Sequence, residues 1–253
     1  MKLKLVTFNV RISRPTEFAL RVGPIADKIN LEQPDIICFQ ELSTEMKAML
    51  APLVPDYTFV GCGRLENRLG EGTPTAFRSD RFVISEYRTR WLSQTPMIPA
   101  SRFVCDQSPC TRLYTFSLLT DVATGESLRV YNTHFDHVGA NARSMEADMI
   151  LSAISEDKNA FPFPAVFVGD LNATPEKPEI VKLSSSGMLT DITNHFEQTF
   201  NYFDEPFDYE NEHKIDYIFI SDGITCHDTE LWTYTPEGKY LSDHFGIMAT
   251  LEM

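Results

Sequence analysis

The feature that most restricts the fold of this chain is a series of short runs rich in β-branched and aromatic residues, most of them bordered by turn residues. Such runs have the length and composition of β-strands. Segments with apolar residues at helical spacing lie between them and predict helices over 17–32, 140–155 and 176–185. Mixed strands and helices of this kind indicate a layered α/β or α+β fold. The expected strands cover residues 3–10, 36–40, 75–77, 115–119, 127–133, 165–168, 215–220 and 246–251.

Length and composition indicate one globular unit. The chain has 253 residues, of which 43% are hydrophobic, and it contains no repeat, low-complexity tract or obvious linker. We therefore expect a single domain over residues 1–253. The chain has 22 basic and 36 acidic residues, a formal net charge of −14. Proteins that hold nucleic acid through its phosphates usually carry a basic face, so this balance argues against long duplex DNA as a substrate. A local basic patch remains compatible with it.

Cysteine usage and the N-terminus bear on the compartment. The five cysteines are odd in number and form no CxxC pair, which disfavours a zinc site or a disulfide framework, although Cys105 and Cys110 share a loop and could pair. The first ten residues lack the apolar run of a signal peptide. No stretch approaches the roughly 20 apolar residues of a membrane-spanning helix. We expect a cytoplasmic protein with no membrane partner, and the oligomeric state stays open.

Polar residues recur at the ends of the predicted strands. Strand ends along one edge of a sheet bring together residues that are distant in sequence, so we expect a single site there. The residues in these positions are Asn9, Glu41, His134, Asp136, Asp170, Asn172, Asp216, Asp243 and His244.

The chemistry of this set suits a hydrolase. Glu41, Asp170, Asp243 and Asn9 offer hard oxygen ligands, which suit Mg²⁺ or Mn²⁺. Histidines beside carboxylates act as general acids or bases, or hold a phosphate oxygen. A metal, a histidine and a carboxylate together fit phosphoester hydrolysis by an activated water.

The motifs also resemble those of a known superfamily. The segments TFNV (7–10), FQE (39–41), GEGTPTAFR (70–78), NTHFDH (132–137), GDLN (169–172), KIDYIF (214–219) and SDHFG (242–246) match, in order and approximate spacing, motifs of the endonuclease/exonuclease/phosphatase superfamily. That superfamily includes pancreatic deoxyribonuclease and the abasic-site endonucleases. The resemblance covers essentially the whole chain. It implies a four-layered sandwich of two packed mixed β-sheets flanked by helices, with the active site at one edge between the sheets.

The resemblance also implies a role for each residue of the predicted site. Glu41 looks like the principal Mg²⁺ ligand, with Asn9 and Asp243 beside it and Mn²⁺ as a substitute ion. Asp170 resembles the residue that orients or deprotonates the attacking water, and Asn172 the one that holds the phosphate or a second metal. His244 looks like the catalytic histidine with Asp216 as its carboxylate partner. His134 resembles a second phosphate-facing histidine, oriented by Glu71.

Further candidates for substrate contact lie outside these positions. Arg112 suits a phosphate clamp, because a guanidinium matches phosphate geometry. Asp136, His137 and Arg143 belong to the segment 133–147, which together with 91–96 resembles a bacterial subgroup of largely unassigned substrate. Both arginines could equally be ordinary loop and helix residues. That subgroup often carries an Arg and a Trp-x-x-Arg segment after its first motif; this chain has Arg11 but no such Trp, so we expect its entrance loop to differ.

Three functions remain open. The first is a Mg²⁺-dependent phosphodiesterase or phosphatase that acts on a small or short phosphoester. The second is an endonuclease or exonuclease on DNA or RNA, which needs a basic track near the site. The third is a non-catalytic binding protein with the same fold. Candidates for the basic track are Arg64, Arg68, Arg78, Arg81 and Arg102.

Two segments are expected to lie at the surface. The longest irregular stretch, 93–112, contains three prolines, and loops of this length in compact domains are often functional lids. The acidic run 197–230 is expected to be mostly solvated. Three histidines outside the motifs, His195, His213 and His227, are also expected to be surface residues.

Overall fold

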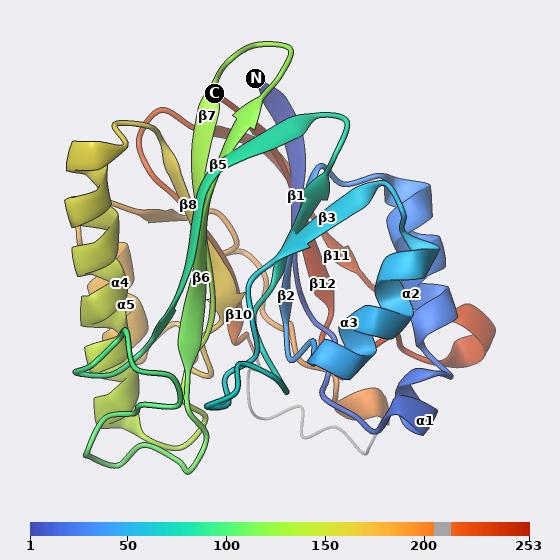
Figure 1. The fold of residues 1–253 in the computed structure, drawn as a ribbon, viewed down its shortest axis with the longest axis horizontal. Coiled ribbons are helices and arrows are strands. Elements are labelled where there is room, and N and C mark those ends of the chain that lie inside the picture. The colour runs from blue at the N-terminus through green and yellow to red at the C-terminus, as the bar shows by residue number, and fades with distance from the viewer. Residues whose placement is uncertain (205–213) are drawn as a thin grey trace.

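The computed structural model describes residues 1–204 and 214–253 and contains two six-stranded sheets packed face to face (Figure 1). The first sheet mixes parallel and antiparallel neighbours, because β1 pairs in parallel with β2 and antiparallel with β12. Its strands, in spatial order, are β11 (Thr225–Trp232), β12 (Gly246–Glu252), β1 (Lys2–Asn9), β2 (Ile36–Gln40), β4 (Thr75–Arg78) and β3 (Tyr57–Val60).

The second sheet is also mixed, with β7 and β8 parallel and its other pairs antiparallel. Its strands, in spatial order, are β5 (Phe82–Trp91), β6 (Leu113–Asp121), β7 (Ser127–His134), β8 (Ala165–Asp170), β10 (Asp216–Ile220) and β9 (Thr190–Asp191). The helices are α1 (Pro15–Phe18), α2 (Val22–Glu32), α3 (Thr44–Leu50), α4 (Ala140–Ala160) and α5 (Pro178–Ser184), with 3₁₀ turns η1 (Ala51–Leu53), η2 (Tyr202–Asp204) and η3 (Pro236–Gly238).

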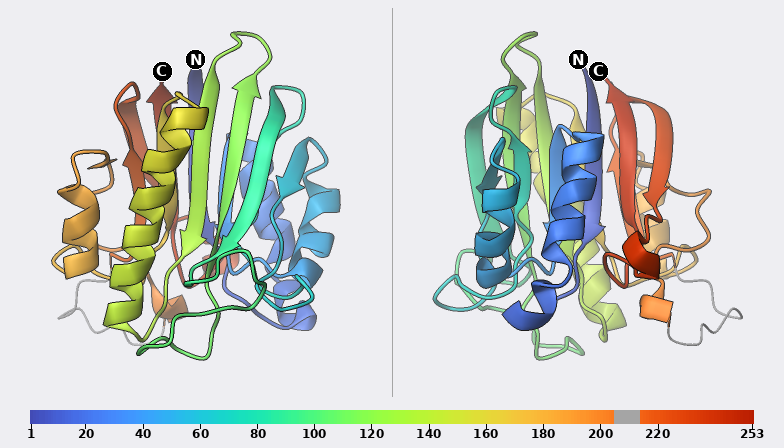
Figure 2. Two further views of the ribbon diagram at one scale, coloured as in Figure 1. Left: turned by 60° about the vertical axis from the view of Figure 1, so that its left-hand side comes forward. Right: turned by 90° about the vertical axis from the view of Figure 1, so that its right-hand side faces the viewer.

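Three apolar clusters give the layers. One lies between the sheets and contains residues from both, including Leu5, Ile36, Val130 and Val166. A second covers the outer face of the first sheet with α1, α2 and α3, and a third covers the outer face of the second sheet with α4 and α5. Figure 2 shows the same order of helices, sheet, sheet and helices. The expected four-layered sandwich of two mixed sheets flanked by helices is confirmed.

Strand direction places the predicted site residues at one end of the sandwich. In each sheet a pair of parallel strands, β1 with β2 and β7 with β8, runs away from the chain termini (Figures 1 and 2). The carboxyl ends of all four strands therefore meet at the end opposite to the termini. Both sheets contribute residues there, and the fold forms a site between them.

The single helix expected over 17–32 is wrong. The structure has two helices, α1 and α2, separated by a turn at residues 19–21. Hydrogen bonds in that turn run from Leu20 N–H to the Glu17 carbonyl and from Arg21 N–H to the Phe18 carbonyl. Pro24 explains the break, since proline has no N–H and its ring clashes with the carbonyl four residues earlier in a continuous helix.

Three edge strands and one helix were not predicted from the sequence. Strands β3, β5 and β11 are edge strands in which most side chains are exposed or half-buried, so they lack the continuous apolar run that marks a buried strand. Helix α3 has only seven residues, and its clearest signal is Ser43, whose hydroxyl accepts a hydrogen bond from Met46 N–H. The eight predicted strands are all present, with ends that differ by at most two residues.

The surface expectations hold only in part for the described residues, because the run 197–230 includes the buried strand β10. No helix or strand interrupts the segment between Trp91 and Leu113, and His195 and His227 are exposed. His213 and part of the acidic run lie outside the described residues. All five cysteines are free thiols, so Cys105 and Cys110 do not pair. Within residues 1–204 and 214–253, no helix has the length and apolar character needed to cross a membrane.

Candidate active site

The pairing of strands brings the predicted site residues together. His134 is level with Asp170 across the parallel pair β7–β8, and Asp170 is level with Asp216 across the antiparallel pair β8–β10. Asn9 ends β1 beside Gln40 at the end of β2, so Glu41 follows at the same edge. The site is therefore a direct consequence of strand register.

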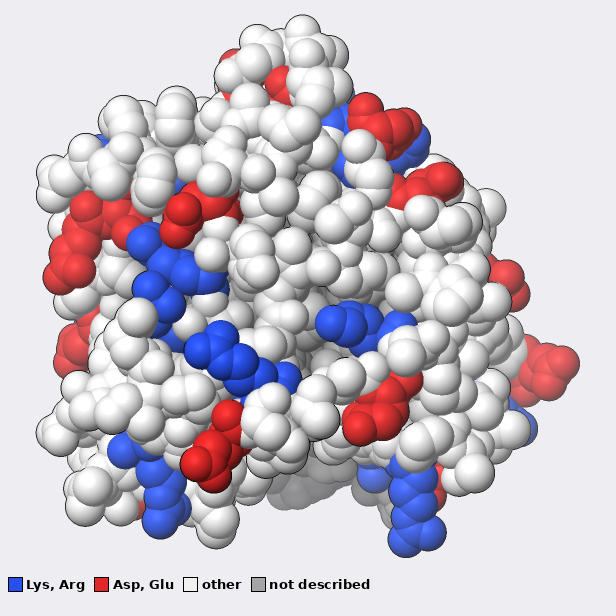
Figure 3. All heavy atoms as spheres, in the orientation of Figure 1, with Lys and Arg blue, Asp and Glu red and all other residues white. Residues whose placement is uncertain are grey.

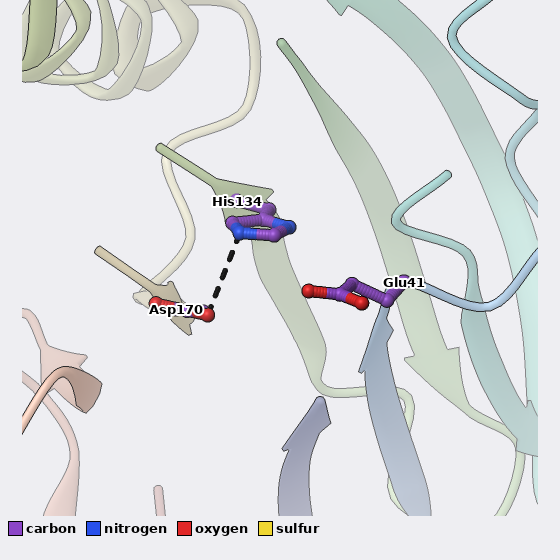
Figure 4. Close-up of side chains that lie close together, drawn as sticks. All are labelled: Glu41, His134 and Asp170. Carbon is purple, nitrogen blue, oxygen red and sulfur yellow. Dashed lines mark ion pairs between the residues drawn. The ribbon is translucent and has the colours of Figure 1, made fainter. Parts of the chain in front are cut away.

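Glu41, His134 and Asp170 form the centre of the site. Their side chains point toward one another from both sheets (Figure 4), with one ligand atom of each within 4.8 Å of the others. His134 Nε2 lies 3.4 Å from Asp170 Oδ2. The Asn9 amide links the two carboxylates, since its Nδ2 donates to Glu41 Oε1 at 3.1 Å and to Asp170 Oδ2 at 2.9 Å.

The backbone of Glu41 is strained. Its φ of 60° lies in the left-handed region, which costs a non-glycine residue about 1 kcal/mol or more. The strained turn aims the carboxylate back into the site, where Ile12 N–H donates to Oε2 at 2.5 Å. Burial raises the pKa of Glu41, but the neighbouring His134 and the hydrogen bonds from Ile12 and Asn9 outweigh burial and hold the pKa below its usual value.

His244 and Asp216 form a buried pair beside Asp170. His244 Nδ1 lies 2.8 Å from Asp216 Oδ2, and its Nε2 lies 3.7 Å from Asp170 Oδ2. Burial lowers the pKa of His244, but the negative charges of Asp216, Asp170 and Asp243 outweigh burial and raise the pKa to about 10. His244 is therefore cationic at neutral pH and holds a proton on the nitrogen that faces the cavity.

His134 has the opposite character. Burial, followed by the nearby charge of Arg112, lowers the pKa of His134 to about 3, against the influence of Asp170 and Glu41. Its Nδ1 lies 3.6 Å from Glu71 Oε1 and makes no hydrogen bond among the described residues. A neutral and a cationic histidine in one site can take different roles toward the same substrate.

The carboxylates of the site fit a divalent cation. Burial, and then the charge of Asp216, raises the pKa of Asp170 against the influence of its two histidines. Burial also raises the pKa of Asp243, which Glu41 raises further. Crowded carboxylates that repel one another are stabilised by a bound ion, and carboxylate and amide oxygens are the ligands that Mg²⁺ and Mn²⁺ prefer.

Two arginines form the opposite wall. Arg64 holds Glu71 through two contacts of 2.8 Å, from Nη1 to Oε1 and from Nη2 to Oε2. Arg112 Nη1 lies 3.6 Å from Glu71 Oε1, and its Nη2 lies 3.0 Å from His137 Nδ1. Arg64 and Arg112 line a cavity of about 370 Å³. The other polar residues that line it are Glu41, Glu71, His134, His137, Asp170, Asn172, Asp243 and His244. The cavity thus has an acidic wall and a basic wall.

The structure does not bring Asp136 and Arg143 into this cavity. Both are more than nine-tenths buried. Asp136 accepts hydrogen bonds from the N–H groups of Ser108, Val138 and Gly139, and Arg143 pairs with Glu179 and donates to the Asp136 carbonyl at 3.1 Å. They fix the segment between β7 and α4, and neither lines the cavity. Asn9 and Asp216 do not line the cavity either, but each is hydrogen-bonded to residues that do.

Some residues of the cavity were missed as site residues. Arg64 was considered only as part of a basic track, Ile215 was not singled out within its motif, and Cys110, Ile12 and Phe200 belong to no recognised motif. The Phe200 ring lies 4.7 Å from the His244 ring, and its backbone pairs with that of His244. No sequence signal announces this contact, because it depends on how the segment after β9 folds back onto the site.

The five arginines considered for a basic track do not form one. Arg64 lines the cavity and Arg68 is exposed nearby. Arg78 is paired with Asp80, and Arg81 with Asp35 and Asp121. Arg102 donates to the Ser108 carbonyl at 3.2 Å.

Solved structures of other proteins resemble this one over the whole chain. A structure from Bacteroides vulgatus, an endonuclease/exonuclease/phosphatase, is 28% identical with a TM-score of 0.92 and covers 100% of this chain and 99% of its own. A family protein from Bacteroides thetaiotaomicron is 26% identical with a TM-score of 0.92 and covers 99% and 95%. A mannosyl-6-phosphatase from the same organism is 25% identical with a TM-score of 0.89 and covers 99% and 100%.

A search of curated protein sequences gave no significant match. The profile of the Endonuclease/Exonuclease/phosphatase family, in contrast, matches residues 6–244. This span includes every residue of the site from Asn9 to His244. The chain belongs to the endonuclease/exonuclease/phosphatase family.

Proposed function

We propose that this protein is a Mg²⁺-dependent hydrolase of small phosphoesters, with Mn²⁺ as a substitute ion. One observation supports this most strongly: a cavity of about 370 Å³ combines crowded carboxylates, a neutral and a cationic histidine, and two arginines. The carboxylates suit a divalent cation and the arginines suit a phosphate. Family membership makes phosphoester hydrolysis the expected chemistry.

The residues divide the reaction among them. Glu41, Asn9 and Asp243 would hold the metal, which supplies positive charge beside the phosphate oxygens when it is bound. Asp170 orients a water and takes its proton as the water oxygen forms a bond to phosphorus. His244 donates a hydrogen bond from Nε2 to a phosphate oxygen, and Asp216 keeps it protonated. Asn172 and neutral His134 hold the remaining phosphate oxygens while the bond to the leaving group breaks, and the leaving oxygen takes a proton from water.

A phosphomonoester fits the basic wall better than a diester. A monoester carries a second negative charge, and Arg64 and Arg112 place two positive charges beside the single negative charge of Glu71 on one side of the cavity. The net charge of −14 disfavours a long polyanion. The similar mannosyl-6-phosphatase provides a precedent for a monoester in this fold. We therefore propose a phosphatase in preference to a phosphodiesterase.

A nuclease is the second candidate, supported by a different observation. A groove of about 490 Å³ between the edge strands β3 and β5 is lined by Arg68, Arg88, Arg90, Phe59 and Tyr87. Figure 3 shows basic side chains gathered around the middle of this face. Arginines interleaved with aromatic rings are typical of surfaces that bind single-stranded nucleic acid.

The test is hydrolysis of p-nitrophenyl phosphate, bis-(p-nitrophenyl) phosphate and supercoiled plasmid, each with Mg²⁺, Mn²⁺ or EDTA. Metal-dependent turnover that is faster on the monoester supports the phosphatase. Plasmid cleavage at low enzyme concentration, with a steep fall on adding salt, supports the nuclease. Binding of Mg²⁺ without hydrolysis of any phosphoester, including a panel of sugar phosphates, would contradict both and favour a binding protein.

A further inference from the structure

A second cavity lies at the other end of the second sheet. Its volume is about 340 Å³ and its lining includes Arg129 near the start of β7 and residues Ile154 and Lys158 of the last turns of α4. Strand β7 runs from this end to His134 in the active site, so the two cavities lie at opposite ends of the same strand (Figure 1). We call this space the α4 cavity.

Arg129 is buried and only partly satisfied. It is 2% exposed. Its Nε donates to the Phe163 carbonyl at 2.8 Å and its Nη1 to the Ile154 carbonyl at 2.8 Å. Nη2 has no hydrogen-bond partner within the described part of the chain, although a guanidinium offers donors on all three nitrogens. Arg129, which carries this free nitrogen, lines the α4 cavity.

The charge of Arg129 also lacks a direct counter-ion. The other two buried arginines, Arg112 and Arg143, lie within 4.0 Å of the carboxylates of Glu71 and Glu179. Among the described residues Arg129 forms no ion pair, and it reaches Asp157 only through the Tyr131 hydroxyl, which donates to Asp157 Oδ2 at 2.7 Å. A buried cation without a paired anion is costly, so an anionic ligand at Nη2 is favoured.

The walls of the α4 cavity select the kind of anion. Lys158 is exposed at its rim and forms no ion pair with any described residue, so it offers a second cation. Ile154, Phe163 and Met188 give an apolar surface. Asp222 at the rim disfavours a doubly charged ligand, as do the carbonyls at the C-terminal end of α4. A singly charged carboxylate with an apolar body fits these walls better than a phosphate.

We propose that the α4 cavity is a binding site for small organic carboxylates, with the ligand carboxylate on Arg129 Nη2 and Lys158 and its apolar body against Phe163 and Met188. This site is separate from the active site and does not depend on the proposed function. Its volume lies at the lower end of the range for small-molecule pockets.

The test is an NMR titration of the ¹⁵N-labelled full chain with benzoate, and with benzamide as the neutral control of the same shape. We expect saturable shifts of the Gly187 and Ser221 amides with benzoate and much weaker shifts with benzamide. Shifts confined to residues of the active-site cavity would show that benzoate uses the other arginines, and would overturn the proposal. Tighter binding of inorganic phosphate at Gly187 and Ser221 would overturn the choice of a carboxylate.

Two variants locate the charge recognition. Arg129→Lys keeps the positive charge but loses the free Nη2, and we expect benzoate binding to weaken by about 10-fold. Lys158→Ala at the exposed rim should weaken it by about threefold, whereas Lys47→Ala on α3 should leave it unchanged. If Arg129→Lys does not fold, the Lys158→Ala variant and the comparison of benzoate with benzamide still test the proposal. Equal binding of benzoate and benzamide, or unchanged binding in Lys158→Ala, contradicts the proposal.

Discussion

The two histidines of the site have the same side chain but opposite charge states. His244 faces three carboxylates and has a raised pKa, whereas His134 lies beside Arg112 and has a lowered pKa. Neighbouring charge explains the difference, because both rings are almost fully buried. A site with one imidazolium and one imidazole can hold a phosphate through a donor on one side without placing two cations next to the metal ligands.

Glu41 and His244 are the residues whose loss should remove most activity. We expect Glu41→Ala and His244→Ala each to lower kcat for p-nitrophenyl phosphate by at least about 100-fold, because each removes several kcal/mol of charge stabilisation from the transition state. The measurement is steady-state kinetics with saturating Mg²⁺, with circular dichroism to check the fold. Glu45→Ala on α3 and His195→Ala at the surface are the matched controls. Wild-type turnover in either site variant would show that its assigned role is wrong.

Arg64 should distinguish a monoester from a diester. Its guanidinium is bound to Glu71 at the basic wall of the cavity. We expect Arg64→Ala to raise KM for p-nitrophenyl phosphate by about 10-fold and to change KM for bis-(p-nitrophenyl) phosphate by much less, since the diester has one negative charge fewer. Arg68→Ala, on the same hairpin but outside the cavity, is the control. Equal losses on both substrates would argue against recognition of the second charge.

The segment between β7 and α4 illustrates how an element can matter to a site without entering it. Asp136 gathers three backbone N–H groups from the segment and from the loop before β6. Glu146, on α4, accepts a hydrogen bond from Asp136 N–H at 2.9 Å, and its Oε1 has no partner among the described residues. These contacts fix His137 and, through it, Arg112 at the cavity wall.

Glu146 should make the stability of the protein depend on pH. Burial raises the pKa of Glu146 to about 8 from its ordinary value of 4.5. The hydrogen bond from Asp136 N–H and the charges of Arg112 and Arg143 oppose this shift, and the charge of Asp136 adds to it. Between these values the folded protein holds a proton that the unfolded chain releases. The free energy of unfolding therefore falls as pH rises, with a slope of up to about 1.4 kcal/mol per pH unit from this group.

Glu146→Gln removes this titration, so its unfolding free energy should fall less between pH 5 and pH 8 than that of the wild type. The measurement is urea denaturation at pH 5, 6, 7 and 8, compared with Glu156→Gln at an exposed position of the same helix. Parallel pH curves for the wild type and Glu146→Gln would show that Glu146 titrates normally.

At the scale of the whole molecule, the sequence best predicted the strands that are buried on both faces and the site residues at their ends. Strands buried on both faces, such as β2 and β8, have continuous apolar runs, and residues at their ends reach one site because parallel strands share an edge. Edge strands such as β5 and β11 lack that signal because their side chains face solvent. The helix break before Pro24 is indicated by the proline itself.

The parts of the site that could not be predicted depend on loops. Arg64 reaches the cavity from a hairpin whose two sides are joined by its contacts with Glu71, and Phe200 reaches it from the segment after β9. Neither contact follows from periodicity or from strand order. The roles of Asp136 and Arg143 were also beyond prediction, because a charged residue near a motif looks the same in sequence whether it faces substrate or a buried partner.

A metal ion should stabilise the fold, because its proposed ligands are distant in sequence and meet only in the folded chain. Asn9 ends β1, Glu41 follows β2 and Asp243 precedes β12. An ion held among them binds the folded state only, so it stabilises the whole molecule. At a Mg²⁺ concentration 100 times the Kd, this contributes about 2.7 kcal/mol to the free energy of unfolding. For a chain of this length, that corresponds to a rise in Tm of roughly 5–10 °C.

Asp243→Asn should separate the effect of the ion from the effect of carboxylate crowding. Its raised pKa indicates that the charged carboxylate is destabilising in the absence of metal. We expect the metal-free variant to melt slightly above the metal-free wild type, and its rise in Tm with Mg²⁺ to be less than half as large, because one proposed ligand is weakened. The measurement is differential scanning calorimetry with EDTA and across a Mg²⁺ titration, with the exposed Asp228→Asn as control. If Asp243→Asn responds to Mg²⁺ as the wild type does, Asp243 is not a ligand, whereas a wild type without any response would remove the metal from the proposed function.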